Sequence, residues 1–432
     1  MNKDSKCVKR LLDLFDEGTF EEIGAKVRSG SHDAEVVTGY GYVDGTPVYA
    51  FSQNREVNGG AMGKVHAAKI AKIYSLAEKT GLPVIGIYDS EGAYLSEGLG
   101  ALDAYGTLVK TANNLSGVVP QISVVAGVCA GTSAVMAISA DIVIMTKDAK
   151  LCLNAQSGDS AEAAEKNGTA HAVFESDEQA IECARRIVNM LPVNNLAVVP
   201  STVSAEPSGK ACCPVGTVID DGSKIPLSKK FGKSVKTVLA RISGVTCGIV
   251  KISADDGVVG ADDCVKAARF VRMCDSFSLP VITFVDAERF GDKSVSALRA
   301  AAMLSHAYAE ATTVKISVVT GKACGAIFAC VASKSAQADL VLALDTALIS
   351  VIDPEAAALT LMSDRREKGE SLEALAKEYE RENCSPDLAA ADGFIDDVVT
   401  ISELRGKLIS ALDMLSGKRV SGLDKKHSNM PL

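Results

Sequence analysis

Leu82–Asp89 reads LPVIGIYD, and the chain repeats this segment as LPVITFVD at Leu279–Asp286. A second segment, ISVVAG at Ile122–Gly127, returns as ISVVTG at Ile316–Gly321. All four runs are almost entirely apolar, which is typical of strands buried on both faces of a parallel sheet. Two segments repeated in the same order imply two homologous domains and two related binding surfaces.

The turns that follow the second strand of each copy also match. In the first copy, CAGTS at Cys129–Ser133 leads through an Ala/Ser-rich stretch to ADIV at Ala140–Val143. In the second copy, ACGA at Ala323–Ala326 leads in the same way to ADLV at Ala338–Val341. Strands that alternate with helices predict an α/β fold with a βαβ core in each domain.

The length of 432 residues suits two domains, and the repeat favours two of similar size. Pro200–Pro226 is rich in Pro, Gly, Ser and Lys, which is typical of a linker. We therefore expect domains over 1–205 and 206–432. The apolar periodicity and the turn residues further predict hairpins over 36–51 and 237–252 and helices over 8–15, 61–80, 96–115, 131–139, 261–276, 294–311, 371–382 and 404–415.

The composition excludes several classes of function. The net charge is −9 and no block of Lys or Arg occurs, so nucleic-acid binding is not expected. The N-terminus lacks a secretory core, and no apolar run approaches the roughly 18 residues of a membrane span, so a cytoplasmic protein without transmembrane segments is predicted. The twelve cysteines include no Cys-x-x-Cys pair, which favours small buried side chains over metal ligands.

The two small-residue turns are the candidate reactive sites. A helix that starts directly after a strand leaves backbone N–H donors without intrahelical partners, and two such donors aimed at one point form an oxyanion hole. Gly131 and Thr132 would supply the first turn, and Gly325 and Ala326 the second. The alternative is that both glycines only permit close packing of helix on strand.

A third turn carries two carboxylates, Glu91 and Glu97, which would suit acid/base chemistry or a solvated helix start. The chain has five histidines, and none pairs in sequence with a candidate serine or cysteine nucleophile. An enzyme of this sequence would therefore rely on backbone groups and a cofactor more than on side chains.

A set of segments, in order along nearly the whole chain, resembles the carboxyltransferase (β) subunits of biotin-dependent acyl-CoA carboxylases and decarboxylases, of the propionyl-CoA carboxylase type. The segments are VVTGYG at 36–41, NGGAMGKVHAAKI at 58–70, SGVVPQIS at 116–123, CAG at 129–131, AARFVRMCD at 267–275, YAEAT at 308–312, GFIDD at 393–397 and the KKH tail at 425–427.

This resemblance implies two tandem crotonase-like (ClpP/crotonase) domains, the first on the acyl-CoA side and the second on the biotin side. The implied activity is transfer of a carboxyl group between carboxybiotin and a short-chain acyl-CoA such as propionyl-CoA or methylmalonyl-CoA. No biotin-attachment sequence of the Ala-Met-Lys-Met type occurs, so biotin would be carried on a separate carrier protein. The resemblance also implies a homo- or hetero-oligomer, dimer-based or hexameric, and no metal.

The resemblance implies roles for particular residues. Gly131 and Thr132 match the first oxyanion hole, and Gly325, Ala326 and Ile327 match the second. The implied substrate-binding residues are Gly92, Ala93, Ala130 and Cys324.

Several positions depart from the family pattern. A Ser-Gly-Gly-Ala-Arg turn reads SEGAY at Ser90–Tyr94, a Tyr-Gly-Gly-Ala turn reads CGAI at Cys324–Ile327, and the loop over 287–292 is shortened. These departures leave two alternatives open. One is a catalytically reduced paralogue that acts as a structural partner of an active subunit. The other is a different crotonase-fold acyl-CoA enzyme, a hydratase or thioester hydrolase, with Glu91 or Glu97 as its base.

Overall fold

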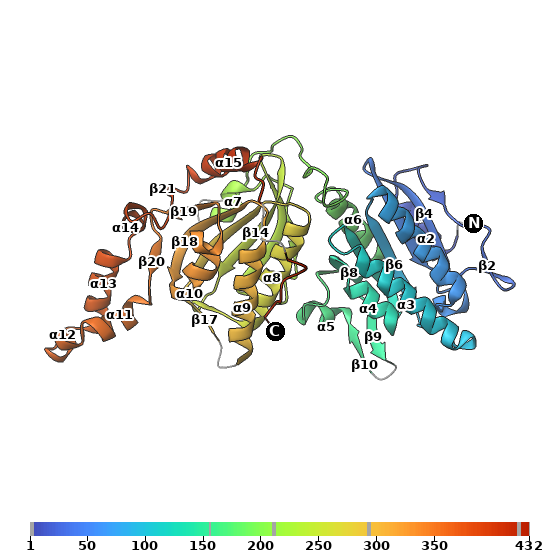
Figure 1. The fold of residues 1–432 in the computed structure, drawn as a ribbon, viewed down its shortest axis with the longest axis horizontal. Helices are drawn as coiled ribbons and strands as arrows, with labels where there is room; N and C mark the ends of the chain where they lie inside the picture. The colour runs from blue at the N-terminus through green and yellow to red at the C-terminus, as the bar shows by residue number, and fades with distance from the viewer. Residues whose placement is uncertain (1–3, 155–156, 210–212, 292–294, 421–424, 432) are drawn as a thin grey trace. The chain divides into compact units, whose positions relative to one another are not determined.

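The computed structural model describes residues 4–154, 157–209, 213–291, 295–420 and 425–431. The chain forms two compact units, Met1–Pro200 and Ser201–Leu432, and the division falls inside the segment expected to be the linker. Figure 1 shows both units as α/β structures, and each is described by itself below. Of the segments named from the sequence, the linker positions 210–212, the end of the loop at 292 and the start of the expected helix at 294 lie outside the described residues.

The first unit contains a mixed sheet in which an antiparallel hairpin leads into parallel strands. The hairpin turns at Asp44 and Gly45, whose φ angles of 47° and 81° suit the expected Asp-Gly turn. The strand order is β1 (Glu21–Glu22), β4 (Val36–Val43), β5 (Thr46–Gln53), β6 (Val84–Ser90), β7 (Gln121–Ala130), β8 (Ile142–Thr146) and β11 (Ala172–Phe174).

Helices pack on both faces of this sheet. Val84 and Tyr88 of β6 belong to a core with α2 (Lys64–Thr80) and α3 (Leu99–Asn114). Ile85 and Ile87 alternate with them and are also fully buried, so they face the opposite side. There, α1 (Lys6–Leu14) and α6 (Asp177–Val188) pack on each other and on the strands.

The second unit repeats this plan. Its strand order is β12 (Ile225–Leu227), β13 (Val235–Ile242), β14 (Val245–Ser253), β16 (Val281–Ala287), β18 (Lys315–Cys324), β19 (Leu340–Leu344) and β21 (Asp397–Val399). The packed helices are α8 (Ala261–Ser276) and α9 (Val295–Glu310), with α7 (Pro214–Val218) and α15 (Leu404–Leu415) in a second apolar cluster with the strands (Figure 1).

The remaining elements are connections and additions. They are β2 (Arg28–Ser29), β3 (His32–Asp33), β9 (Lys150–Asn154), β10 (Ser157–Ser160), β15 (Val258–Val259), β17 (Arg289–Phe290), β20 (Leu348–Ser350), α4 (Thr132–Ile138), α5 (Ala161–Lys166), α10 (Gly325–Ile327), α11 (Pro354–Leu361), α12 (Ser363–Glu367), α13 (Leu372–Asn383) and α14 (Pro386–Ala391), with short helical turns at 58–60, 95–97, 328–332 and 334–336.

Both units bend their central strand at the same place. In the first unit, β7 pairs with β8 as far as Val125 and then with β9 from Val128 onward. In the second, β18 pairs with β19 as far as Val319 and then with β20 from Lys322 onward. A register shift against the preceding strand marks each bend, as expected of a β-bulge.

A glycine and an aspartate make each bend possible. Asp89 accepts a hydrogen bond from the backbone N–H of Val128 at 3.3 Å, and a Cβ on Gly127 would lie 2.0 Å from Asp89 Oδ1. The equivalent Cβ on Gly321 would lie 2.2 Å from Asp286 Oδ1. Only glycine therefore leaves room for the carboxylate at these two bends.

Both predicted hairpins and the long helices are confirmed, with two differences of note. The helix expected over 61–80 begins at Lys64, because Asn58–Gly60 forms a tight turn with Gly59 at φ 66°. The helix after the second small-residue turn is much shorter than its counterpart, since α10 ends at Ile327 and continues only as a π-type turn.

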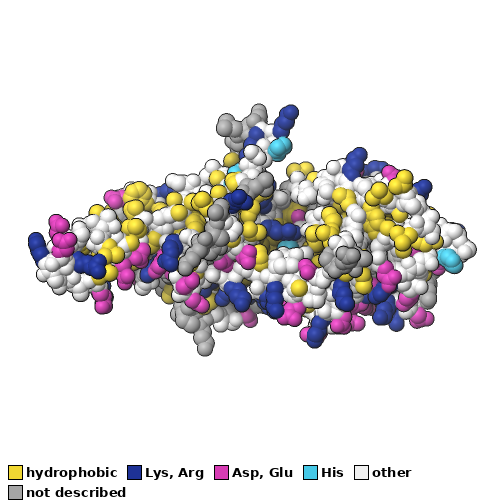
Figure 2. Space-filling view, turned by 90° about the horizontal axis from the view of Figure 1, so that it is seen from below, with side chains coloured by type: hydrophobic (Ala, Val, Ile, Leu, Met, Phe, Trp, Pro, Cys, Tyr) yellow, Lys and Arg dark blue, Asp and Glu magenta, His cyan; other side chains and the backbone are white. Residues whose placement is uncertain are grey.

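Charged side chains of both signs are interspersed on the face drawn in Figure 2, in keeping with the absence of a basic block in the sequence. Within the described ranges, no helix combines the length and the apolar character needed to cross a bilayer.

Substitution of Gly127 by alanine should destabilise the first unit, because the added methyl group would displace the Asp89 carboxylate. We expect a loss of about 1–3 kcal/mol, typical of overpacking at a rigid site, measured by denaturant unfolding. Gly106→Ala is the matched control, because a Cβ there meets nothing within 4 Å and glycine weakens a helix interior. Equal stability of the two variants would contradict the packing described here.

Candidate active site

The first small-residue turn joins β7 to α4 through Gly131. This residue has φ 63° and ψ −134°, a conformation that favours glycine. Its N–H donates to the carbonyl of Cys152 in β9 at 2.7 Å, which continues the pairing of β7 with β9. The Gly131 N–H is therefore already used, and this glycine sets the turn.

The next residue provides the available donor. Thr132 is the first residue of α4, and its N–H has no acceptor within the part of the chain that the structure describes. Ala134 N–H, by contrast, donates to the carbonyl of Gly131 at 3.0 Å. Thr132 is partly exposed, and an N–H at a helix start carries partial positive charge that can stabilise a developing oxyanion.

The segment 91–94, which follows β6, lies beside this turn and is called the rim. The N–H of Met62 donates to the carbonyl of Gly92 at 2.8 Å, and Tyr94 N–H donates to Met62 O at 2.8 Å. Since N–H groups alternate in direction along an extended segment, Ala93 N–H points away from Met62. Gly92 lies close to Ala130, because a Cβ on Gly92 would be 3.8 Å from the Ala130 Cβ.

The structure therefore brings together three predicted residues, Gly92, Ala130 and Gly131, with the exposed Ala93 beside them. Thr132 and Ala93 offer two backbone N–H groups without acceptors among the described residues. These two donors lie on neighbouring turns and are the candidates for an oxyanion hole.

The second unit has the same rim. The N–H groups of Glu288 and Arg289 donate to Gly257 O at 2.9 and 3.1 Å, and Gly291 N–H donates to Val259 O at 3.0 Å. These bonds extend the parallel pairing of β15 with β17. The N–H of the intervening residue, Phe290, therefore points away from β15 as that of Ala93 points away from Met62.

The second turn lies at the edge of a cavity of about 1200 Å³. Gly325 has φ 49°, and a Cβ there would lie 2.9 Å from the carbonyl of Val351. Ala326 is exposed, and its N–H has no acceptor in the described residues. Small side chains form much of the cavity wall: Ala297, Ala301, Ala302, Ala326 and Ala356.

Two predicted residues of this turn are buried side chains. Ile327 is fully buried and does not line the cavity, so its β-branched side chain leaves the turn unobstructed. Cys324 is also buried, packing with Leu348 and Tyr379 at the cavity wall. Burial raises the pKa of the Cys324 thiol to about 11, so it stays protonated near neutral pH.

Ion pairs also lie in the wall of this cavity, and the one next to the second turn joins Lys322 to Glu288. Lys322 Nζ is 2.5 Å from Glu288 Oε1. This hydrogen bond to Glu288 raises the pKa of Lys322, so the lysine keeps its charge at neutral pH.

The two candidate carboxylates of the first unit have structural partners. Glu97 Oε2 accepts the backbone N–H of Lys64 at 2.7 Å, which caps the start of α2. Glu91 Oε1 lies 2.8 Å from Arg55 Nη2 on an exposed surface. These contacts favour structural roles and give no support to Glu91 or Glu97 as a general base.

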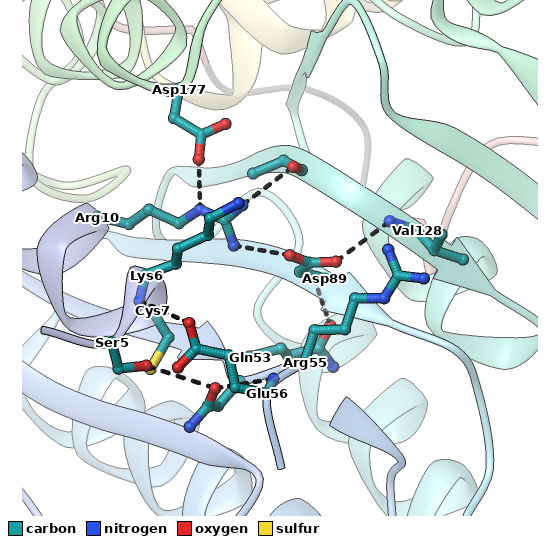
Figure 3. Close-up of polar contacts among 12 residues, drawn as sticks. Ser5, Lys6, Cys7, Arg10, Gln53, Arg55, Glu56, Asp89, Val128 and Asp177 are labelled. Atoms are coloured by element: carbon teal, nitrogen blue, oxygen red, sulfur yellow. Dashed lines mark hydrogen bonds and ion pairs between the residues drawn. The ribbon is translucent and has the colours of Figure 1, made fainter. Parts of the chain in front are cut away.

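Sequence reasoning missed a polar network behind the first turn, drawn in Figure 3. Arg10 of α1 donates from Nη1 to Asp89 at 3.0 Å, from Nη2 to Ala126 O at 3.1 Å and from Nε to Asp177 at 2.7 Å. Arg10 lies on the buried face of α1, so a charge in an otherwise apolar helical stripe was the available signal.

The network continues through neutral groups. Gln53 Oε1 accepts the N–H of Asp89 at 3.0 Å, and its Nε2 lies 3.4 Å from His66 Nε2. If the Gln53 amide donates there, the His66 Nδ1–H donates to Ala61 O at 3.3 Å, which describes a neutral imidazole. Burial lowers the pKa of His66 to about 4, in agreement with that assignment.

No group of His, Cys, Asp or Glu within the described residues is arranged to hold a metal ion. Backbone N–H groups without acceptors among the described residues are the feature that the two repeated turns share. In two repeated α/β units, such turns favour an enzyme that stabilises a developing oxyanion through backbone N–H groups.

Comparison with known proteins gives the family. The carboxyl transferase domain model matches residues 5–430. Methylmalonyl-CoA decarboxylase subunit alpha of Propionigenium modestum is 33% identical over 478 aligned residues, covering 98% of this chain and 92% of that protein. Propionyl-CoA carboxylase beta chain of Saccharopolyspora erythraea is 34% identical over 497 residues, covering 100% and 91%.

A solved structure agrees with these relatives. Transcarboxylase 12S, with methylmalonyl-CoA and methylmalonic acid bound, has a TM-score of 0.93 and 30% identity, covering 99% of this chain and 92% of that one. The chain belongs to the carboxyl transferase domain family. The crotonase-like fold and the carboxyltransferase class expected from the sequence are thereby confirmed.

His66 should make stability depend on pH. Its pKa is about 4 in the folded protein and about 6.5 when unfolded, so the unfolded state binds the proton more readily. The contribution of His66 to the free energy of unfolding is therefore complete above pH ~6.5. It is lost as the pH falls towards 4, by up to roughly 3 kcal/mol. In denaturant unfolding at pH 7 and 5, His66→Gln should lose less stability on acidification than the unsubstituted protein. Identical losses would contradict this role.

Proposed function

We propose that this chain is the carboxyltransferase subunit that moves a carboxyl group between carboxybiotin, held on a separate carrier protein, and a short-chain acyl-CoA such as propionyl-CoA or methylmalonyl-CoA. The main support is one pair of unengaged backbone donors on the two matching, neighbouring turns of each unit. The relatives are named for propionyl-CoA or methylmalonyl-CoA, and these names support the choice of acyl group.

The first unit would bind the acyl-CoA. Gly92, Ala93 and Ala130 would line the thioester, and the N–H groups of Ala93 and Thr132 would donate to its carbonyl oxygen. When methylmalonyl-CoA loses its carboxyl group as CO2, the electron pair of the broken C–C bond moves into the thioester and negative charge gathers on that oxygen. The two donors stabilise this charge most strongly in the transition state, because they are already oriented before the reaction. In the reverse direction the same donors would stabilise the enolate that attacks CO2.

The second unit would bind biotin, which supplies the carboxyl-carrying chemistry when it is present. The cavity of about 1200 Å³, whose wall includes several alanines, has a volume large enough for the fused rings of biotin. The N–H groups of Phe290 and Ala326 would donate to the ring oxygen, with Gly325 setting the turn. Cys324 would pack beneath the site, and Ile327 would anchor α10 in the core.

The domain roles follow from these sites, with an acyl-CoA domain over 1–205 and a biotin domain over 206–432. We further propose that the enzyme is cytoplasmic, forms homo- or hetero-oligomers and recruits a biotin carrier protein. The transcarboxylase 12S structure describes a hexamer, which supports an assembly of carboxyltransferase subunits.

The activity is tested by incubating the purified chain with a biotinylated carrier domain and methylmalonyl-CoA labelled with carbon-14 in its carboxyl group. Label should pass to the biotinylated carrier domain, while the same carrier domain without biotin should remain unlabelled. No transfer with malonyl-, methylmalonyl- or other short acyl-CoAs would reject the proposal. Co-purification with a second, active carboxyltransferase subunit would then support the structural-partner alternative.

The backbone donors can be removed one at a time with proline. Thr132→Pro deletes the N–H at the first position of α4, where proline is tolerated and no intrahelical hydrogen bond is lost. We expect kcat to fall roughly 10²–10³-fold, as for the loss of one oxyanion-hole donor, with circular dichroism unchanged.

Thr132→Ala is the matched control, because it keeps the N–H and should keep most of the activity. In the second unit, Ala326→Pro and Ala326→Ser form the corresponding pair. Similar kcat values for Thr132→Pro and Thr132→Ala would show that the Thr132 N–H takes no part in the reaction.

A further inference from the structure

We infer that Arg10 is a positioning residue for the oxyanion hole of the first unit. Arg10 clamps the end of β6 to the bend of β7, and the turns that follow these two strands carry the Ala93 and Thr132 donors. The inference rests on the proposed function, since it assigns these two donors to the acyl-CoA. It extends that function to α1, which lies outside the βαβ core.

The contacts of Arg10 join three separate parts of the chain (Figure 3). Its guanidinium binds Asp89 at the end of β6 and the carbonyl of Ala126 at the bend of β7. The Asp89 carboxylate in turn accepts the N–H of Val128 on the far side of that bend. Asp177, at the start of α6, holds the guanidinium from behind.

Each donor lies a short turn beyond a clamped residue. Ala93 comes shortly after Asp89, just past the end of β6, and Thr132 comes shortly after Val128, just past the end of β7. The separation of the two donors therefore depends on how β6 and β7 meet at the bend. A displacement of about 1 Å in a reacting group can cost 100-fold in rate, so a stiff clamp at this point matters for catalysis.

The second unit shows the same bend without such a clamp. Asp286 accepts the N–H of Lys322 at 3.0 Å, but it forms no ion pair within the described residues. Asp286 is only partly buried, and with Lys251 and Thr320 it lines a cavity of about 420 Å³. Water can solvate that carboxylate, so the bend itself does not require an arginine.

In the first unit, α1 covers the equivalent carboxylate, that of Asp89. Arg10 is 5% exposed and Asp89 is 7% exposed, so the carboxylate there depends on a protein cation. Arginine suits this position because its planar fork donates to all three acceptors at once, and a lysine ammonium at the same point cannot span them.

The test is Arg10→Lys, with Arg185→Lys as matched control. Arg185 is another largely shielded arginine of the first unit with several partners, donating to Leu14 O at 2.6 Å and to Asp16 at 2.9 Å. Among the described residues, none of its hydrogen bonds or ion pairs reaches β6 or β7. Both variants keep the charge and should lower the unfolding temperature.

Only Arg10→Lys should lower kcat, by about 100-fold, with KM for the biotin carrier unchanged. Hydrogen–deuterium exchange of the peptide amides over 126–132 should also be faster in Arg10→Lys than in Arg185→Lys. Asp177→Asn weakens the contact of Arg10 with residue 177 and leaves its other two contacts in place. It should give a smaller loss of kcat and a smaller rise in exchange. This variant replaces Arg10→Lys in the test if Arg10→Lys does not fold.

Equal kcat and equal exchange in Arg10→Lys and Arg185→Lys would overturn the inference and leave the network a purely structural one. The exchange measurement needs no turnover. If the unsubstituted chain transfers no carboxyl group, the proposed function fails, while faster exchange over 126–132 in Arg10→Lys still supports the positioning role of Arg10.

Discussion

An aspartate carboxylate held against a glycine backbone, once in each unit, is the contact on which both candidate sites depend. Asp89 and Asp286 end their strands where the neighbouring strand changes partners, and each accepts an N–H from that neighbour. Gly127 and Gly321 leave room for the carboxylates. The bends turn β7 and β18 towards β9 and β20, and the small-residue turns follow directly. The reactive backbone is thus placed by a polar contact inside the sheet.

Much of the fold could be predicted because the information was local or repeated. The apolar strands, the Asp44-Gly45 turn and the long helices are set by side-chain periodicity and by glycine, which act over a few residues. The bend was not predicted, because Gly127 and Gly321 read as ordinary strand residues until the facing aspartate is placed. The shortness of α10 was missed for a similar reason, since its end depends on tertiary packing.

The candidate site was predicted at the level of the turns and less well at the level of individual atoms. Sequence reasoning paired Gly131 with Thr132 as donors, but β9 takes up the Gly131 N–H, and no local pattern shows that. It also missed Arg10 and Gln53, whose partners are distant in sequence. Glu91 and Glu97 drew attention as a carboxylate pair, whereas the structure gives them surface and capping contacts.

The position of Arg10 near the N-terminus has a consequence for the order in which the first unit forms during synthesis. Its two acidic partners are 79 and 167 positions away along the chain. As the chain emerges from the ribosome, α1 carries an unneutralised guanidinium on its apolar face until β6 and then α6 have been made. Contacts of such long sequence separation form late. The first unit should therefore close in its final form only near the end of its own translation, with α1 as the last element to settle.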